Sequence, residues 1–375
     1  MDNINFLNKK SKIKIIPIAS GKGGVGKTFL SSNLAVTLGK AGKNTVVIDM
    51  DIGGSNLHTV LGIKNSNKGI GSLITKRNIK LKDLLIETQY ENLKLISGDI
   101  LIPGVSDISS SKRRNIIKSL YELKCEYLIV DLGAGSSDNI VDFMLLSSFP
   151  LMVVTPQITS VLNAYSLAKN LIYRLLYILT DKDRKATNVI NSFKRKIVEG
   201  EKKTVWDILN KIYSVNKKYS NQFKKIVEKL RIKLVVNMMQ TKEDNAIIKK
   251  MISQIYQKLA LKIDIIGILP YNQSVNYSIA KRVPIVSYND ESIITTNVND
   301  IGNKIVDFSE RSDNSNLVFS EKMFDEFDNS ILDESEPKDD SMFDKTSLLN
   351  KITSQEKEIN RLRHIIKILT NNKDV

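Results

Sequence analysis

The chain has 375 residues, of which 42% are hydrophobic, and its 56 Lys and Arg residues against 41 Asp and Glu give a net charge of +15. This length and composition are typical of one large folded domain or two small ones, each with a real core. The single cysteine, Cys125, excludes a disulfide framework, a four-cysteine zinc site and an iron–sulfur cluster held by this chain alone. No stretch approaches the roughly 18 apolar residues of a membrane span, so we expect a cytoplasmic protein.

The charge is unevenly distributed along the chain. Residues 310–344 hold 12 acidic and 3 basic side chains, and residues 345–375 hold 3 acidic and 7 basic, which leaves residues 1–309 with a net charge of +20. A basic body suggests nucleic acid or an anionic membrane as a partner. However, Lys outnumbers Arg 45 to 11 and Ile occurs 49 times, a skew expected of an AT-rich genome whatever the protein binds. The charge alone therefore does not identify a partner.

Short runs rich in β-branched residues alternate with helical patterns along the body of the chain. The runs typical of buried strands are residues 13–19, 45–49, 93–96, 127–131, 151–155, 232–237 and 263–269. Such alternation predicts an α/β fold, a doubly wound and mostly parallel sheet with helices on both faces. Pro17 cannot donate a ladder hydrogen bond, so the first strand is expected either to be locally irregular or to place this position outside its paired stretch.

A glycine-rich loop directly follows the first predicted strand and opens a helical pattern. Residues 21–28 read Gly-Lys-Gly-Gly-Val-Gly-Lys-Thr, which satisfies the phosphate-loop template of Gly, four residues and Gly-Lys-Thr. Backbone N–H groups of such a loop curl around phosphates, and the helix N-terminus adds a favourable dipole. Lys27 is expected to reach the terminal phosphates and Thr28 to ligate Mg²⁺. The expected nucleotide-binding residues of this segment are Gly21, Lys22, Gly23, Gly24, Val25, Gly26, Lys27, Thr28 and Phe29.

The lysine at the second position of the loop makes the chain resemble a particular family. Lys22 is similar to the signature lysine of the deviant phosphate loop in the ParA/MinD superfamily of P-loop ATPases. Residues 47–57 (VIDMDIGGSNL) resemble the switch I segment of that superfamily, and residues 127–135 (YLIVDLGAG) resemble its Walker B and switch II. The resemblance covers about residues 12–308, apart from a helical insertion at about 182–230.

Within the superfamily, the MinD and FlhG (FleN) branch is the most similar. The segments that carry this similarity are 53–58 (GGSNLH), 131–135 (DLGAG) and 163–165 (NAY). Two features depart from the branch. The N-terminal segment through which flagellar regulators engage their GTPase partner is not evident in residues 1–12. The periodic segment at 347–369 is separated from the body by an acidic stretch, whereas the membrane helices of MinD-type proteins follow the domain closely.

The resemblance implies a role for each polar position. The superfamily binds ATP with Mg²⁺ and forms an ATP-dependent homodimer, in which the signature lysine, here Lys22, contacts the nucleotide of the partner subunit. By position, Asp51 would polarise the attacking water, Asp131 would hold Mg²⁺ through water, and Asp49 would support the metal from behind. The expected catalytic residues are Lys22, Lys27 and Asp51, and the expected metal site is Thr28, Asp49 and Asp131. Hydrolysis is expected to be slow and stimulated by a protein partner, because the site borrows a lysine and no arginine finger is evident in cis.

Asp49 and Asp131 also have a physical rationale that is independent of the resemblance. Both end predicted parallel strands, at the edge where open α/β sheets bind ligands. A buried carboxylate there is costly without a positive partner, and Mg²⁺ bound to a phosphate supplies one. An Asp at a strand end can also cap a helix, but the phosphate loop nearby favours a metal site.

Two further positions resemble the adenine contacts of the superfamily. Asn237 closes a predicted strand, and Pro270 lies in the loop 269–272, which in the family passes the base on its other side. An Asn after a strand is also a common turn former, so this assignment has a structural alternative. Asn33 fits a family position too, with packing as the alternative role.

About 75 residues separate the predicted strands at 151–155 and 232–237, far more than a crossover needs. Residues 182–233 hold 16 basic and 5 acidic side chains. Apolar residues recur there at helical intervals, at Val205, Ile208, Leu209, Ile212, Phe223, Ile226, Val227 and Leu230. We therefore expect a helical insertion at about 182–230, with a Lys-rich face that is either ordinary solvated surface or a ligand-binding patch.

The character of the sequence changes after residue 309. Residues 310–344 are rich in Ser, Asn, Asp and Glu, which predicts an acidic disordered linker. Ile352, Ile359 and Ile366 then recur every seven residues, which predicts one amphipathic helix at 347–369. The expected organisation is a P-loop ATPase domain at 1–309, the linker at 310–344 and a C-terminal amphipathic segment at 345–375.

Two classes of function fit these expectations. A positioning switch for the division site or the flagellum would reach the inner face of the plasma membrane through the basic helix at 347–369, whose alternative uses are partner binding and dimerisation. A ParA-like partition ATPase would instead bind DNA without sequence specificity through the lysines of 182–233. The metabolic branch of the superfamily, with iron–sulfur carriers, nitrogenase-type reductases and arsenite pumps, needs paired cysteines and is excluded by the single cysteine.

Overall fold

The computed structural model describes residues 13–51, 54–64, 69–75, 79–98, 110–147, 149–198 and 203–311. The expected linker beyond Arg311 and the expected helix at 347–369 lie outside these residues, as do residues 1–12 and positions 52 and 53 of the expected switch I segment.

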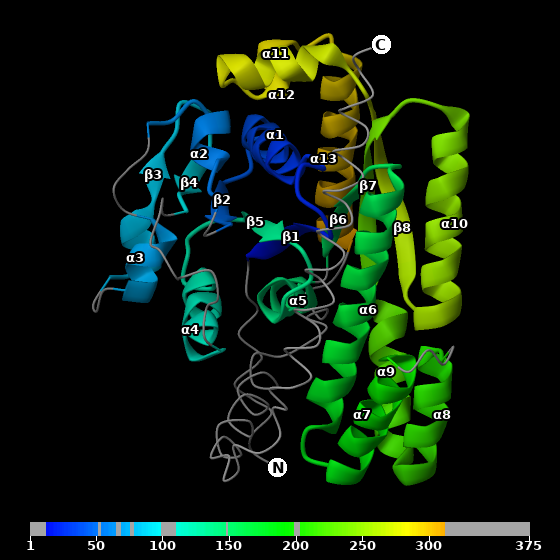
Figure 1. The fold of residues 1–375 in the computed structure, drawn as a ribbon. Helices are drawn as coiled ribbons and strands as arrows, with labels where there is room; N and C mark the ends of the chain where they lie inside the picture. Colours follow the sequence, from blue (N-terminus) through cyan, green and yellow to red (C-terminus); the bar gives the residue numbers. More distant parts are fainter. Residues whose placement is uncertain are drawn as a thin grey trace, which may run out of the picture. The chain divides into compact units, whose positions relative to one another are not determined.

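An eight-stranded sheet forms the centre of the fold, in the order β3-β4-β2-β5-β1-β6-β7-β8 (Figure 1). The strands are β1 (Lys14–Ser20), β2 (Thr45–Met50), β3 (Ile86–Glu87), β4 (Leu93–Ile96), β5 (Tyr127–Ala134), β6 (Leu151–Val154), β7 (Arg231–Met239) and β8 (Lys262–Pro270). All neighbours pair in parallel except β3, which is antiparallel to β4. The predicted doubly wound sheet and its seven predicted strands are confirmed, and only the two-residue β3 was missed.

Pro17 lies in the central strand β1 at a position where its missing N–H group costs little. It is opposite Val130 of β5, but pairing of β1 with β6 begins only at Ile18. On the β6 side, the Ser147 hydroxyl donates to the carbonyl of Ile15 at 2.6 Å. Because alternate residues of a strand direct their backbone groups to the same side, Pro17 faces this unpaired stretch as well. The second of the two alternatives for this proline is therefore confirmed.

Helices cover both faces of the sheet (Figure 1). They are α1 (Lys27–Lys40), α2 (Leu57–Val60), α3 (Ile70–Thr75), the 3₁₀ helix η2 (Leu81–Leu84), α4 (Ser110–Leu120), α5 (Asp138–Leu145), α6 (Ile158–Thr180), α7 (Arg184–Val198), α8 (Val205–Val215), α9 (Lys217–Lys229), α10 (Lys242–Leu259), α11 (Gln273–Lys281), α12 (Ile285–Tyr288) and α13 (Ile293–Arg311). No helix within the described ranges has the length and apolar character needed to cross a bilayer.

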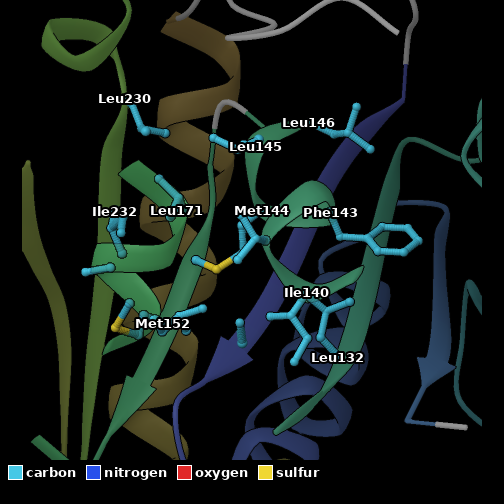
Figure 2. Close-up of a cluster of buried hydrophobic side chains, with 14 of the residues drawn as sticks. Leu132, Ile140, Phe143, Met144, Leu145, Leu146, Met152, Leu171, Leu230 and Ile232 are labelled. Atoms are coloured by element: carbon cyan, nitrogen blue, oxygen red, sulfur yellow. The ribbon is translucent and has the colours of Figure 1, made fainter. Parts of the chain in front are cut away.

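Alternate side chains of the strands feed two buried clusters. Ile15 and Ala19 of β1 belong to the cluster with α4, α5, α6 and α10, whereas Ile16 and Ile18 belong to the cluster with α1, α12 and α13. Figure 2 shows the part of the first cluster that Phe143 of α5 joins. This alternation is what a parallel sheet buried on both faces requires.

The segment between β6 and β7 is helical, as its periodicity predicts. Seven of the apolar side chains that set the pattern are buried, and Ile226 is partly buried. Thr204 and Asp207 form a reciprocal cap at the start of α8, and the Asn216 side chain accepts a hydrogen bond from the Lys218 N–H at the start of α9. The buried side chains join the cluster on the α5 and α6 face of the sheet, so these helices share the main core.

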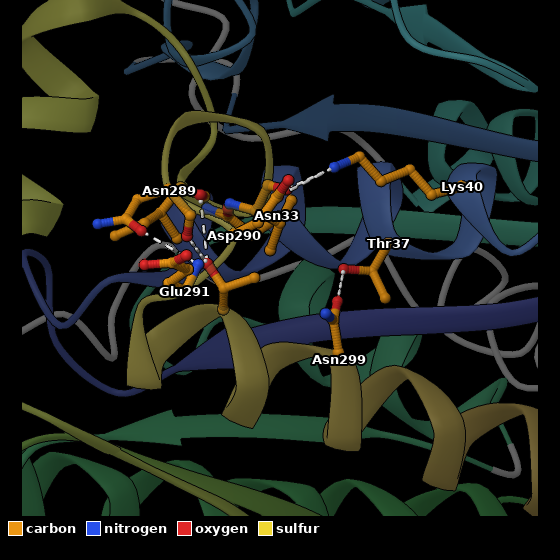
Figure 3. A network of polar contacts seen from close by, with 10 residues as sticks. Asn33, Thr37, Lys40, Asn289, Asp290, Glu291 and Asn299 are labelled. Carbon is orange, nitrogen blue, oxygen red and sulfur yellow. Dashed lines mark hydrogen bonds and ion pairs between the residues drawn. The ribbon is translucent and has the colours of Figure 1, made fainter.

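Helix α1 is fixed to α12 and α13 by a polar network (Figure 3). The Asn33 side chain donates to the Phe29 carbonyl at 2.7 Å and accepts from the Val286 N–H at 3.2 Å. The Thr37 hydroxyl donates to Asn299 Oδ1 at 3.0 Å, and Lys40 lies 3.6 Å from Asp290. Asn33 thus has the packing role that was its alternative interpretation, and it holds the helix that begins in the glycine-rich loop.

Candidate nucleotide-binding site

A cavity of about 380 Å³ opens at the carboxyl edge of the sheet. Its wall is built by loops that follow β1, β2, β5, β7 and β8. The lining residues are Gly23, Gly24, Gly26, Lys27, Thr28, Phe29, Asp51, Gly54, Asn56, Val60, Ala134, Asn237, Met238, Pro270, Tyr271, Asn272, Val275, Asn276 and Ile279. Ligands of open α/β sheets bind at this edge, so the cavity is the expected place for a nucleotide.

The glycine-rich loop packs so tightly that two of its glycines have no room for a side chain. A Cβ on Gly21 would lie 2.2 Å from the Asn163 carbonyl of α6, and one on Gly26 would lie 2.3 Å from Asn237 Nδ2. Gly26 also has a φ of 95°, a left-handed conformation that glycine adopts at little cost. It is the N-cap of α1 and no side chain caps the helix, so the first N–H groups of α1 are available to an anion.

Lys27 brings a positive charge to the wall of the cavity. Its side chain is 7% exposed, and burial lowers the pKa of its amine. The carboxylates of Asp131, Asp51 and Asp49 act in the opposite direction and favour the charged amine. The three carboxylates therefore help to keep the buried Lys27 amine charged, the form in which it can bind a phosphate.

The carboxylate of Asp131 is buried next to Thr28 and Ser31 at the start of α1. It is 1% exposed and lies opposite Asp49 in the pairing of β2 with β5. Burial and the charge of Asp49 raise its pKa to about 7, against hydrogen bonds from Thr28 and Ser31 and the charge of Lys27. The Ser31 hydroxyl donates to Asp131 at 2.9 Å. A divalent cation beside Thr28 would lower this pKa, so the donor set fits Mg²⁺ bound together with a phosphate.

Asp49 organises the loop that carries Asp51. One of its carboxylate oxygens accepts the Asp51 N–H at 3.0 Å, and the other accepts the Ser55 hydroxyl at 2.7 Å and the Leu57 N–H at 3.1 Å. Burial is the main cause that raises the pKa of Asp49, and these three hydrogen bonds oppose it. Asp49 does not line the cavity, whereas Asp51 does, with its carboxylate lying between Gly54 and Gly133.

Lys22 lies beside the start of α6 and does not line the cavity of its own chain. Its amine donates to the Thr159 hydroxyl at 2.8 Å. The Ser20 hydroxyl donates to the Lys22 carbonyl at 2.7 Å, which fixes the backbone at the first turn of the loop. The side chain is partly exposed.

Asn237 and Pro270 line the cavity at the ends of β7 and β8. The Asn237 side chain donates to the Val25 carbonyl at 2.9 Å and accepts the Met238 N–H at 2.9 Å. It therefore ties the end of β7 to the phosphate loop. Met238 lies in the left-handed region with a φ of 58°, an uncommon conformation for a non-glycine residue that occurs preferentially at functional sites.

Of the residues expected to bind nucleotide or metal or to act in catalysis, nine line the cavity: Gly23, Gly24, Gly26, Lys27, Thr28, Phe29, Asp51, Asn237 and Pro270. Gly21, Lys22, Val25, Asp49 and Asp131 lie around it without lining it. The sequence interpretation missed Val60 of α2, Met238 of β7 and three residues of α11, Val275, Asn276 and Ile279. The Asn272 cap of α11, which accepts from the Ser274 N–H at 2.8 Å, is a sequence signal that could have placed this helix.

Comparison with known proteins places the chain in a nucleotide-binding family. The family model described as the CobQ/CobB/MinD/ParA nucleotide binding domain matches residues 16–285. The chain is 33% identical over 172 residues to the flagellum site-determining protein YlxH of Helicobacter pylori, covering 44% of this chain and 56% of that protein. It is 29% identical over 159 residues to the antiactivator FleN of Pseudomonas aeruginosa, covering 42% and 56%. The chain thus spans just over half the length of these relatives.

The solved structures agree on the fold. MinD of Pyrococcus horikoshii, complexed with Mg-ADP, superposes with a TM-score of 0.54 at 21% identity, covering 78% of this chain and 96% of that one. The family model matches well over half of the chain and includes the glycine-rich loop, Asp51, Asp131 and Asn237. The chain therefore belongs to the CobQ/CobB/MinD/ParA nucleotide-binding family.

Proposed function

We propose that the chain is a MinD/FlhG-like molecular switch that binds and slowly hydrolyses ATP, dimerises with ATP, and acts in spatial positioning of the division site or the flagellum at the membrane. The observation that carries the proposal is the cavity in which the phosphate loop, Asp51 and Asn237 meet, while Lys22 lies outside it. The relatives named for flagellum site determination and antiactivation support this class of process.

In this proposal, each group of the cavity has one task. The α1 N-terminus and Lys27 hold the phosphates, and Asn237 and Pro270 hold the base. Mg²⁺, bound by Thr28 and the phosphates with Asp131 behind, would neutralise charge on the phosphates. Asp51 orients the attacking water, and Asp49 keeps Asp51 in place through the Asp51 N–H.

Lys22 supports the dimeric part of the proposal. A lysine of the phosphate loop that does not line its own cavity is free to reach the nucleotide of a second copy after exchanging its Thr159 contact. Turnover then depends on assembly, which makes intrinsic hydrolysis slow and leaves room for an activating protein partner.

Replacing Asp51 by Ala tests the hydrolytic part. We expect binding of Mg·ATP and dimerisation to persist while phosphate release is abolished, because Asp51 lines the cavity without belonging to the phosphate loop. Asp300→Asn, an exposed change on α13, is the control and should match the parent. Hydrolysis by Asp51→Ala at the parent rate would overturn the assignment.

Membrane action is tested with anionic vesicles and the full chain. An Ile359→Asp/Ile366→Asp variant places charge on the apolar face of the expected helix at 347–369, and it should lose ATP-dependent sedimentation with vesicles. An Asn360→Asp/Asn371→Asp variant adds the same charge away from that face and is the matched control. Equal sedimentation of all three proteins would exclude this helix as the membrane contact.

A ParA-like partition ATPase that binds DNA without sequence specificity is the second candidate, and the basic helices α7–α9 favour it. Residues 184–198 and 203–229 hold 12 basic and 2 acidic side chains. Such binding would weaken steeply with salt. A Lys194→Glu/Arg195→Glu/Lys196→Glu variant, changed at three exposed positions of α7, should then lose duplex DNA. Retention of DNA by this variant would exclude the patch.

A further inference from the structure

The helices α8, α9 and α10 border an apolar pocket within the basic surface of the chain. A cavity of about 290 Å³ opens there, lined by Trp206, Leu209, Phe223, Lys224, Val227, Glu228, Tyr256, Ala260 and Lys262. Trp206 is 42% exposed and Tyr256 is 51% exposed, so two large aromatic side chains remain partly open to water. Apolar surface of this kind with a charged rim is typical of an interaction site.

Residues 312–328, which follow the described fold, are acidic where the surface around the pocket is basic, and they contain apolar side chains that could fill an apolar pocket. Residues 312–328 hold 5 acidic side chains and 1 basic one. The apolar residues among them are Leu317, Val318, Phe319, Met323, Phe324 and Phe327. Phe319, Met323 and Phe327 recur every four residues, a spacing that would gather them on one face of a helix formed on binding.

This segment follows α13, which packs against β8, and Lys262 at the start of β8 lines the pocket. Close to the end of α13, the Phe308 ring lies 5.1 Å from the Phe149 ring, and the Lys233 amine lies 5.0 Å from the Phe308 ring. Lys233 is two residues along β7 from Arg231, which pairs with Lys262 of the pocket wall.

The segment is long enough to reach the pocket. The 17 residues of 312–328 span up to about 56 Å when extended. Length therefore leaves room for the chain to pass around the edge of the sheet.

We propose that residues 312–328 dock on this surface of their own chain, with Phe324 and Phe327 against Trp206 and Tyr256 and with their carboxylates beside the lysines of α9. Opposite net charges of the two parts favour the contact, and apolar burial in the pocket gives it specificity. The docked segment covers lysines that would otherwise meet a polyanion, so binding of an anionic partner to α7–α9 requires its release. This inference is independent of the nucleotide chemistry.

The single tryptophan of the chain, Trp206, reports directly on this contact. Acrylamide quenching of its emission is compared between the full parent chain and a Phe324→Ser/Phe327→Ser variant. Both substitutions lie outside the described fold, so the body remains folded. We expect the quenching constant to rise about twofold in the variant, because an undocked segment leaves the ring open to the quencher. A Met342→Ser/Phe343→Ser variant is the matched control and should quench like the parent.

Equal quenching of the parent and the Phe324→Ser/Phe327→Ser variant would overturn the proposal. Carbodiimide cross-linking with mixed isotopic labels then separates docking within one chain from docking on a second copy. We expect cross-links within one chain, at every protein concentration, between Lys224, Lys225 or Lys262 and the acidic residues of 321–328. Cross-links found only between differently labelled chains, or none between these residues, would contradict it.

Discussion

Replacing Asp49 by Asn perturbs the position of Asp51 without touching the phosphate loop. The Asp49 carboxylate accepts the Asp51 N–H on one oxygen, and the Ser55 hydroxyl and the Leu57 N–H on the other, at 2.7 to 3.1 Å. An Asn side chain has one acceptor oxygen and one donor amide. In either orientation, the side-chain amide of the variant would therefore face a backbone N–H and could not accept its hydrogen bond.

Two opposing effects set the size of the change. Each lost hydrogen bond to a charged acceptor is worth about 1.5–3 kcal/mol. In the other direction, removing a buried charge relieves the desolvation that raises the pKa of Asp49 and the repulsion that raises the pKa of Asp131. Global stability is therefore expected to change little, whereas the loop loses the group that positions it. Since a misplacement of 1 Å can cost about 100-fold in rate, we expect kcat to fall by about two orders of magnitude.

Phosphate release, binding of a non-hydrolysable ATP analogue and urea unfolding distinguish these effects. The Asp49→Asn variant should bind the analogue about as tightly as the parent, unfold at a similar urea concentration and hydrolyse ATP about 100-fold more slowly. The exposed change Asp300→Asn is the control for substituting an acidic side chain. Hydrolysis at the parent rate by Asp49→Asn would refute the positioning role.

Further predictions concern the core, the pH dependence and the loop. Asp142→Asn should cost about 3–5 kcal/mol in urea unfolding, because it removes the charge that pairs with the buried Arg113 at 2.9 Å and Arg174 at 2.7 Å; a loss below about 1 kcal/mol would contradict this. The pKa of Asp131 is raised from 3.8 to about 7, so without nucleotide the free energy of unfolding should fall as the pH rises from about 4 to 7. Asp131→Asn should flatten this fall in urea unfolding, and parallel pH profiles of the two proteins would argue against it. Gly26→Ala should abolish nucleotide binding in a fluorescent ATP titration, because the φ of Gly26 is 95° and a Cβ there would meet Asn237. Gly42 is also left-handed but lies outside the cavity, so Gly42→Ala is the control and should leave binding intact.

The sheet and the phosphate loop could be predicted from the sequence because each leaves a local pattern. Buried parallel strands read as apolar runs, and the loop has a fixed template between a strand and a helix. β3 could not be predicted, since two residues carry no periodicity and it forms only against β4.

Side-chain roles that depend on distant contacts were harder to predict. Asn33 and Asn237 were placed from a family resemblance, but their hydrogen bonds to Val286 and Val25 join segments more than 200 residues apart. The helices between β6 and β7 were predicted from their spacing, whereas their membership of the main core depends on how they pack against α6. The cavity wall contributed by α11 likewise depends on the path of the chain after β8.

The most direct test of the account is complementation between two inactive variants. If Lys22 acts on the nucleotide of the partner subunit, Lys22→Ala and Asp51→Ala chains should each hydrolyse almost no ATP. An equimolar mixture should then recover about a quarter of the parent turnover, because half of the random dimers carry one complete site. If the mixture stays as inactive as its components while both chains bind ATP, Lys22 does not act across a dimer and the central claim is contradicted.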